Sequence, residues 1–186
     1  MTSTSPKRCY VTAWDRDVVA AFDASHDDIL VIERPTLSEV AAAMKSARVH
    51  DWRAVVTMAD ADTRAAEAIK TLSLDCPLLA ADIAAVARSF LAQFDASEAS
   101  LRVEVVTTNT CPKFHCDNIR VRVVTTYHGP GTEYVLAATP DDIHRGPTGA
   151  LIFLKGHKHP THSDALLHRS PMVPAGVKRL CVILNI

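Results

Sequence analysis

Long apolar runs are missing from this sequence of 186 residues. No apolar stretch approaches the roughly 20 residues that a membrane-spanning helix needs, so we expect no membrane partner. The first residues, MTSTSPKRCYVTAW, also lack the apolar core of a signal peptide. These two absences predict a cytoplasmic protein.

A strong charge of either sign is missing as well. The formal net charge is -1, and neither Lys nor Arg forms a long run. Bulk electrostatics therefore gives no indication of a nucleic-acid partner. The hydrophobic fraction of 48% and the charged fraction of 22% are ordinary for a globular protein. At this length we expect a single domain over residues 1–186.

Cysteine pairs with the spacing of a zinc ribbon or a thioredoxin-like motif are absent. The five cysteines are scattered and odd in number: Cys9, Cys76, Cys111, Cys116 and Cys181. Without an export signal we expect reduced thiols rather than a disulfide framework. Most of them are expected to be small buried apolar side chains.

The character of the chain changes near residue 100. Residues 1–99 are rich in alanine and show helical patterning, with a capping box of Thr36 and Glu39 before one of the helices. The pattern predicts helices over 36–46, 61–72 and 79–94, and short strands over 29–32 and 54–57. We interpret this region as helical support for the rest.

β-branched residues concentrate in residues 100–186. They predict strands over 101–108, 119–127, 133–137, 150–154 and 178–186. Turns containing Gly and Pro separate these strands, and one of them is Gly129-Pro130-Gly131. The chain therefore has the pattern of an α+β protein, with helices packed on one side of an antiparallel sheet or jelly roll.

The segment Cys111-Pro112-Lys113-Phe114-His115-Cys116-Asp117 contains a candidate metal site. In extended backbone, His115 and Asp117 point to the same face. A second histidine from a distant strand would complete a 2-His-1-carboxylate triad, the arrangement of non-haem Fe(II) oxygenases. His168, shortly before the last apolar strand, is our candidate. The alternative is a His-Asp pair that hydrogen-bonds to backbone at a strand end.

The order of segments after residue 100 resembles the double-stranded β-helix Fe(II)/2-oxoglutarate oxygenases, in particular the prolyl-4-hydroxylase-like branch. In those enzymes a His-x-Asp motif precedes a tyrosine, a Gly-rich turn, a Gly-initiated apolar strand, the distal histidine and a basic residue. Here the His-x-Asp motif precedes VVTTYHGPGTE, GALIFL, His168 and then Lys178 and Arg179. The resemblance implies a jelly-roll, cupin-like core that binds Fe(II) and 2-oxoglutarate.

A second resemblance is to a bacterial family, domain of unknown function number 1826. It rests on the strings CPKFHCDNIRVRVVTTYHGPGTEYV, LIFLKG and LLHRSP. Members of that family are associated with bacterial zinc-limitation gene sets. The resemblance therefore implies metal biology without specifying a reaction.

A 2-oxoglutarate site needs a cation for the distal carboxylate, and Lys178 and Arg179 are the two candidates. Alternation places Lys178 on the more apolar face of its strand, which we interpret as the inward one. Arg179 is the chemically better anchor because its guanidinium binds a carboxylate through two hydrogen bonds. Tyr127 is a further candidate donor to the same carboxylate, and a buried tyrosine bonded to backbone is its alternative.

Two other groups of residues have metal-binding potential. Residues 156–162, Gly-His-Lys-His-Pro-Thr-His, place three histidines in an expected loop that is either solvated or binds zinc or nickel weakly. Cys111 and Cys116 flank His115 and suit a zinc site only if this segment is a loop.

Three functions are compatible with these patterns. The first is an Fe(II)/2-oxoglutarate-dependent oxygenase that hydroxylates a small molecule or a protein side chain. The second is a non-catalytic zinc-binding protein of metal homeostasis, and the third is a cupin-like protein without metal.

Overall fold

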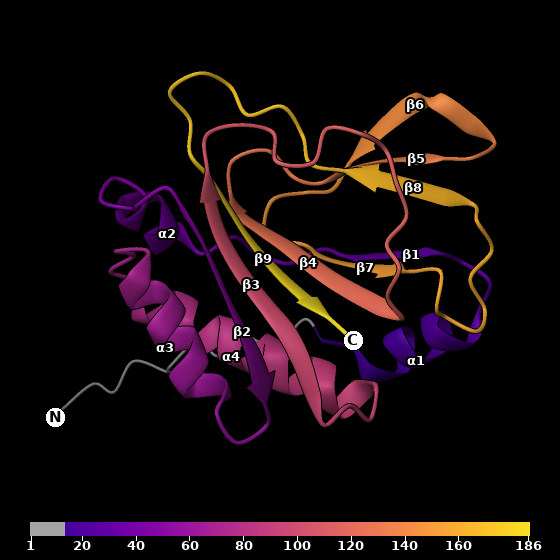
Figure 1. Ribbon diagram of the computed structural model, residues 1–186, viewed down its shortest axis with the longest axis horizontal. Coiled ribbons are helices and arrows are strands. Elements are labelled where there is room, and N and C mark those ends of the chain that lie inside the picture. The colour runs from indigo at the N-terminus through magenta and orange to yellow at the C-terminus, as the bar shows by residue number, and fades with distance from the viewer. Residues whose placement is uncertain (1–13) are drawn as a thin grey trace, which may run out of the picture.

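The computed structural model describes residues 14–186 (Figure 1). Cys9 and almost all of the N-terminal stretch assessed for a signal peptide lie outside the described residues. The helices are α1 (Arg16–Ala24), α2 (Ser38–Ala43), α3 (Ala61–Thr71) and α4 (Pro77–Gln93). The strands are β1 (Ile29–Ile32), β2 (His50–Thr57), β3 (Glu98–Val106), β4 (Val121–His128), β5 (Glu133–Leu136), β6 (Thr139–Arg145), β7 (Leu151–Lys155), β8 (Leu166–Arg169) and β9 (Arg179–Asn185).

The strands form two sheets. The larger has six strands in the order β1-β7-β4-β9-β3-β2, and the smaller has three in the order β6-β5-β8. Every strand pair is antiparallel. Strands β1 and β2, from the first 99 residues, lie at the two edges of the large sheet. The N-terminal region therefore contributes strands to the jelly roll as well as helices beside it.

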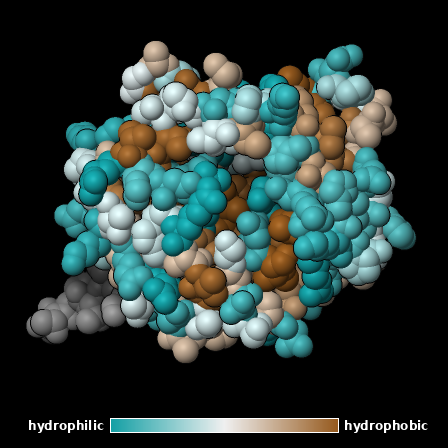
Figure 2. Space-filling model, viewed as in Figure 1, coloured by the Kyte–Doolittle hydropathy of each residue, from teal (hydrophilic) through white to brown (hydrophobic). Residues whose placement is uncertain are grey.

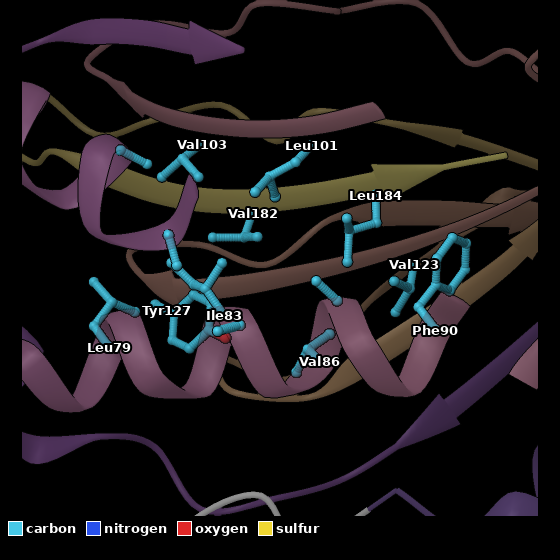
Figure 3. Close-up of a cluster of buried hydrophobic side chains, with 14 of the residues drawn as sticks. Leu79, Ile83, Val86, Phe90, Leu101, Val103, Val123, Tyr127, Val182 and Leu184 are labelled. Atoms are coloured by element: carbon cyan, nitrogen blue, oxygen red, sulfur yellow. The ribbon is translucent and has the colours of Figure 1, made fainter. Parts of the chain in front are cut away.

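The helices cover one face of the large sheet. Alternate residues of β3, β4 and β9 pack there against α4, whose buried side chains include Leu79, Ile83 and Phe90. Figure 3 shows these side chains between the helix and the strands. The largest buried apolar cluster is thus the layer between helices and sheet, as the amphipathic pattern of 79–94 predicts.

The opposite face of the large sheet carries a smaller apolar cluster and is partly covered by the three-stranded sheet. Val124, Ile152 and Ile183 of the large sheet pack there with Leu166 of β8. Figure 1 shows β5, β6 and β8 on the side of the large sheet away from the helices. Both faces of the large sheet are therefore buried, which explains why β7 and β9 are apolar along nearly their whole length.

Several helices and strands begin or end at other residues than the sequence predicts. α3 and α4 match the predicted helices closely, whereas α2 is shorter than predicted and lacks the Thr36 cap. Its N-cap residue is Leu37, which makes no side-chain capping bond and is 6% exposed. Packing of Leu37 in the core, rather than a capping box, sets the start of this helix.

Three elements were not predicted: α1, β6 and β8. Helix α1 has a side-chain cap, since Asp15 accepts hydrogen bonds from the backbone N–H groups of Asp17 and Val18. Strand β6 is exposed along most of its length and has no apolar alternation. Strand β8 is only four residues long. Within the described residues, no helix has the length and apolarity to cross a membrane.

The cysteines of residues 14–186 are free thiols, as expected. The expectation that most are buried is half right. Cys76 and Cys181 are buried, whereas Cys111 is exposed and Cys116 is half-buried.

Candidate metal centre

His115 and His168 face each other across an antiparallel bridge. The backbone N–H of each donates to the carbonyl oxygen of the other at 3.0 Å. Their rings lie on the same side, with centroids 4.6 Å apart. His168 belongs to β8, whereas His115 lies in the irregular segment between β3 and β4, so the bridge fixes the loop histidine against the short strand.

Asp117 completes the group. Its Oδ1 lies 3.7 Å from His115 Nε2, and its Oδ2 lies 3.0 Å from His168 Nε2. One donor atom from each residue falls within 4.8 Å of the others. Bonds of about 2.1 Å place neighbouring ligands of an octahedral ion roughly 3.0 Å apart. The three side chains therefore lie close to the spacing of a facial triad, and small rotations would complete it.

The carboxylate of Asp117 has an oxygen without a hydrogen bond. Asp117 Oδ2 is buried and accepts none, although Arg122 Nη1 lies 2.6 Å away and His168 Nε2 lies 3.0 Å away. Both contacts are close enough for ion pairing. A buried carboxylate oxygen that accepts no hydrogen bond is suited to bind a cation.

The protonation of the two histidines also suits a metal. His115 Nδ1 lies 2.8 Å from the Lys113 carbonyl oxygen, so the Nδ1–H group donates a hydrogen bond there and Nε2 is left as the ligand atom. Burial lowers the pKa of His168 despite the opposing effect of Asp117, which favours the neutral imidazole. Burial alone would raise the pKa of Asp117, but His168 and Arg122 outweigh it and hold the pKa below its usual range.

The triad opens into a cavity between the two sheets that is rich in arginine. The three candidate ligands line it, and so do Val124, Cys181 and Ile183. The other lining residues have polar or charged side chains: Arg102, Glu104, Cys111, Arg122, Thr132, Arg169, Ser170 and Arg179. Figure 2 shows the surface on one side of the molecule, mostly hydrophilic with hydrophobic side chains in its central hollow. Four guanidinium groups make this cavity a suitable environment for an anion.

Arg179 lines this cavity and is 2% exposed. Its Nε donates to the Pro130 carbonyl oxygen at 2.8 Å, and its Nη1 donates to Glu104 at 3.3 Å. Gly129 makes this approach feasible, because a Cβ there would lie 3.1 Å from the Arg179 Cα and the backbone φ is +84°. The predicted turn at 129–131 therefore orients this arginine.

Lys178 does not line the cavity. Alternation places it on the predicted apolar face, but that face packs against the helices. Its Nζ donates to the Ala47 carbonyl oxygen at 2.7 Å, beyond the end of α2. The inference that the more apolar face points toward the metal site was wrong, because the site lies on the opposite face of β9.

Tyr127 also lies on the helix side of the sheet and does not line the cavity. Its hydroxyl donates to Asp82 of α4 at 2.6 Å and accepts from Arg34 at 3.0 Å. Burial and the charge of Asp82 raise the pKa of Tyr127 well above its ordinary value, so it remains a neutral donor. Its contacts join α4, β4 and the segment after β1.

Strand β8 is held in place by ion pairs beside His168. Arg169 Nε donates to Glu133 at 2.8 Å, and Arg145 donates to the other oxygen of the same carboxylate at 2.6 Å. The guanidinium of Arg169 also lies over the ring of Phe114, 4.2 Å from its centroid. These contacts of Arg169 and Arg145 join β5, β6, β8 and the loop that carries His115.

Only one of the two cysteines near His115 lies beside its imidazole. Cys111 Sγ lies 3.7 Å from the imidazole of His115, whereas Cys116 points away from both neighbouring ligands toward His162, at 3.8 Å. The proposed soft site of Cys111, Cys116 and His115 is therefore not assembled. The histidine-rich loop is not simply solvated, because His159 is 4% exposed.

Sequence reasoning missed Arg102, Glu104 and Arg122 as cavity residues. Each lies on β3 or β4 between two apolar residues, in the strings LRVEVV and IRVRVV. Charged residues that alternate with valine within strands buried on both faces indicate a polar space beside the sheet, and this signal was available.

Two solved structures share this fold. One is a dioxygenase for auxin oxidation from rice, at 15% identity and a TM-score of 0.54, with 91% of this chain and 77% of the other covered. The other is dioxygenase for auxin oxidation 1 from Arabidopsis thaliana, solved with 2-oxoglutarate, at 9% identity and a TM-score of 0.54, with 92% and 88% covered. The chain therefore has the double-stranded β-helix fold, with its helices on the outside of the large sheet. No curated protein matches the sequence.

The family model described as Protein of unknown function (DUF1826) matches residues 1–185. The chain belongs to this family, as the three sequence strings indicate.

Proposed function

We propose that this protein is a non-haem Fe(II)- and 2-oxoglutarate-dependent oxygenase. The observation that carries the proposal is the convergence of His115, Asp117 and His168 beside an arginine-lined cavity. The fold is shared with two dioxygenases, one of which was solved with 2-oxoglutarate.

The three side chains fit Fe(II) as two imidazoles and one carboxylate. Such a ligand set would leave coordination positions open for cosubstrate and O₂. Bound iron would supply the redox chemistry, in which O₂ converts 2-oxoglutarate to succinate and CO₂ and a substrate C–H bond is hydroxylated. The chain itself positions the ligands, neutralises the anionic cosubstrate and excludes water.

Arg179 is our candidate for the distal carboxylate of 2-oxoglutarate. It is a planar guanidinium that lines the cavity, whereas Lys178 and Tyr127 form hydrogen bonds on the other face of the sheet. Arg179 now pairs with Glu104, and Glu104 also lies 2.6 Å from Arg102. Arg102 can therefore retain Glu104 while Arg179 engages the cosubstrate.

A second candidate is an anion-binding protein of cupin-like fold that uses no metal. The Arg122 ion pair favours it, because this guanidinium lies between Asp117 and His168 where a metal would bind. A third candidate is a non-catalytic zinc protein that uses the same three ligands. For the oxygenase, the substrate would be a small molecule or a protein side chain.

Turnover of the cosubstrate tests the proposal. Protein loaded with Fe(II) in air should convert 2-oxoglutarate to succinate slowly even without a substrate. His168→Ala and Asp117→Asn should produce none, while Lys178→Met should retain the wild-type rate. If wild-type protein binds iron stoichiometrically but forms no more succinate than these two variants, the oxygenase proposal fails and a binding function is favoured.

A further inference from the structure

We propose a second, zinc-type metal site formed by Cys116, His157 and His162, with Asp164 as fourth ligand. The donor atoms of the first three lie within 4.8 Å of one another. Cys116 Sγ is 3.8 Å from His162 Nε2, and Asp164 Oδ1 is 2.9 Å from His162 Nε2 and 3.5 Å from His157 Nδ1. Neighbouring ligands of tetrahedral zinc lie roughly 3.3–3.7 Å apart, and the Cys116–His162 and His157–Asp164 distances are near that spacing.

A carboxylate lies at each ring nitrogen of His162, an arrangement that a bound cation would satisfy. The His162 side chain is 6% exposed, with Asp28 at 3.1 Å from Nδ1 and Asp164 at 2.9 Å from Nε2. A neutral imidazole has one N–H and serves only one of these carboxylates. A metal on Nε2, with the proton on Nδ1 toward Asp28, satisfies both carboxylates.

Asp28 is positioned to orient the imidazole of His162. It is 3% exposed, and it accepts hydrogen bonds from Ser163 N and Oγ and from Ala165 N. A fixed carboxylate behind a histidine ligand is the usual outer partner at zinc sites, since it sets the tautomer and the ring orientation. The loop that follows β7 is therefore ordered around His162.

The backbone holds the histidine loop against the segment that carries Cys116. His157 N donates to the Asp117 carbonyl oxygen at 2.9 Å, and Lys158 N donates to that of Ile119 at 3.1 Å. At Gly156 an added Cβ would lie 2.3 Å from the Ile119 carbonyl oxygen. The thiol and the imidazoles are thus brought together by contacts that do not depend on a metal.

The two sites differ in chemistry. One thiolate, two imidazoles and one carboxylate form a borderline-soft tetrahedral set suited to zinc, whereas the His115 site offers only nitrogen and oxygen and suits iron. Cys116 lies between His115 and Asp117 in the sequence, so zinc at the second site would anchor the segment that carries two ligands of the first. This proposal stands whether or not the oxygenase proposal holds.

Cobalt(II) titration of metal-free protein tests the second site, because a thiolate ligand produces a near-ultraviolet charge-transfer band. Wild type should show this band together with tetrahedral d–d absorption, and His168→Ala should retain both. Cys116→Ser should lose the band, while the matched control Cys111→Ser should keep it. His157→Gln changes a half-exposed side chain and should weaken cobalt binding at least tenfold in a protein that still folds.

The site is refuted if wild type with excess cobalt shows no thiolate band, or if the band persists in Cys116→Ser. Unchanged cobalt affinity in His157→Gln also contradicts it, even if Cys116→Ser does not fold. Loss of iron and 2-oxoglutarate binding in His168→Ala with the band retained separates this site from the first one.

Discussion

Arg122 Nη1 lies 2.6 Å from Asp117 Oδ2 without a hydrogen bond between them. The same nitrogen lies 3.2 Å from His168 Nε2, so a positive charge is located where two candidate ligands converge. A divalent cation must displace this guanidinium to reach both atoms. The displaced guanidinium would still have a hydrogen-bond partner, since Arg122 Nε donates to Asn185 at 2.8 Å.

Arg122→Gln should therefore strengthen metal binding. Removing a charge that repels the incoming cation should lower the Kd for Fe(II) at least tenfold, which corresponds to about 1.4 kcal/mol. Competition with a chromophoric chelator under anaerobic conditions measures this Kd. A weaker affinity in the variant would mean that Arg122 supports the ligands rather than competing with the metal.

Arg179→Lys should weaken 2-oxoglutarate binding at least tenfold and leave metal affinity unchanged. The substitution retains a cation beside the buried Glu104 but loses the planar pair of donors. Lys178→Met is the matched control, because Lys178 bonds to backbone on the other face. Calorimetric titration of 2-oxoglutarate into metal-loaded protein measures the cosubstrate affinity, and titration of metal into metal-free protein measures the metal affinity. The reverse pattern, with the loss in Lys178→Met, would contradict the proposed anchor.

Tyr127→Phe should destabilise the fold without affecting the cosubstrate. It removes a buried hydroxyl that joins Asp82 and Arg34, and such losses cost about 1–3 kcal/mol. Urea denaturation should show this loss, with 2-oxoglutarate affinity at the wild-type value. A change in 2-oxoglutarate affinity with no change in the free energy of unfolding would indicate that Tyr127 contacts the cosubstrate.

The stabilising effect of Glu133 should depend on pH. Burial acts to raise the pKa of Glu133, but Arg145 and Arg169 outweigh it and hold the pKa below its usual value. A lowered folded-state pKa stabilises the protein at pH values above the unfolded-state pKa, and the effect is lost as pH falls through the folded-state value.

The free energy of unfolding of wild type minus that of Glu133→Gln should therefore be largest near neutral pH and shrink under acidic conditions. Urea denaturation of both proteins across pH 3–7, a range set by the usual glutamate pKa of about 4.3, measures this difference. A difference that is constant or grows toward acidic pH would show that the ion pairs of Arg169 and Arg145 do not stabilise the small sheet.

The long, strongly patterned elements were predictable from the sequence, whereas the short or exposed ones were not. Helix α4 shows its apolar period directly, and β1 matches the predicted strand residue for residue. Strand β6 is exposed, and β8 has only two buried residues, Leu166 and His168. Their positions depend on pairing with β5, which local sequence does not encode.

The candidate ligands were predictable because spacing and order constrain them. His115 and Asp117 share a face at positions i and i+2, and His168 follows after the apolar strand. The anchor was not predictable from alternation, because helices bury one face of β9 and the small sheet covers part of the other. The more apolar face of β9 is therefore the one that packs against the helices, and Arg179 lies on the other face, which borders the polar cavity.

The most direct test of the central claim is anaerobic titration of the Fe(II)-loaded protein with 2-oxoglutarate, followed by visible absorption. If His115, Asp117 and His168 hold iron with positions open toward the cavity, a metal-to-ligand charge-transfer band should grow to one equivalent of 2-oxoglutarate. The band should be absent from His168→Ala. Stoichiometric iron in the wild-type protein with no such band would contradict the account.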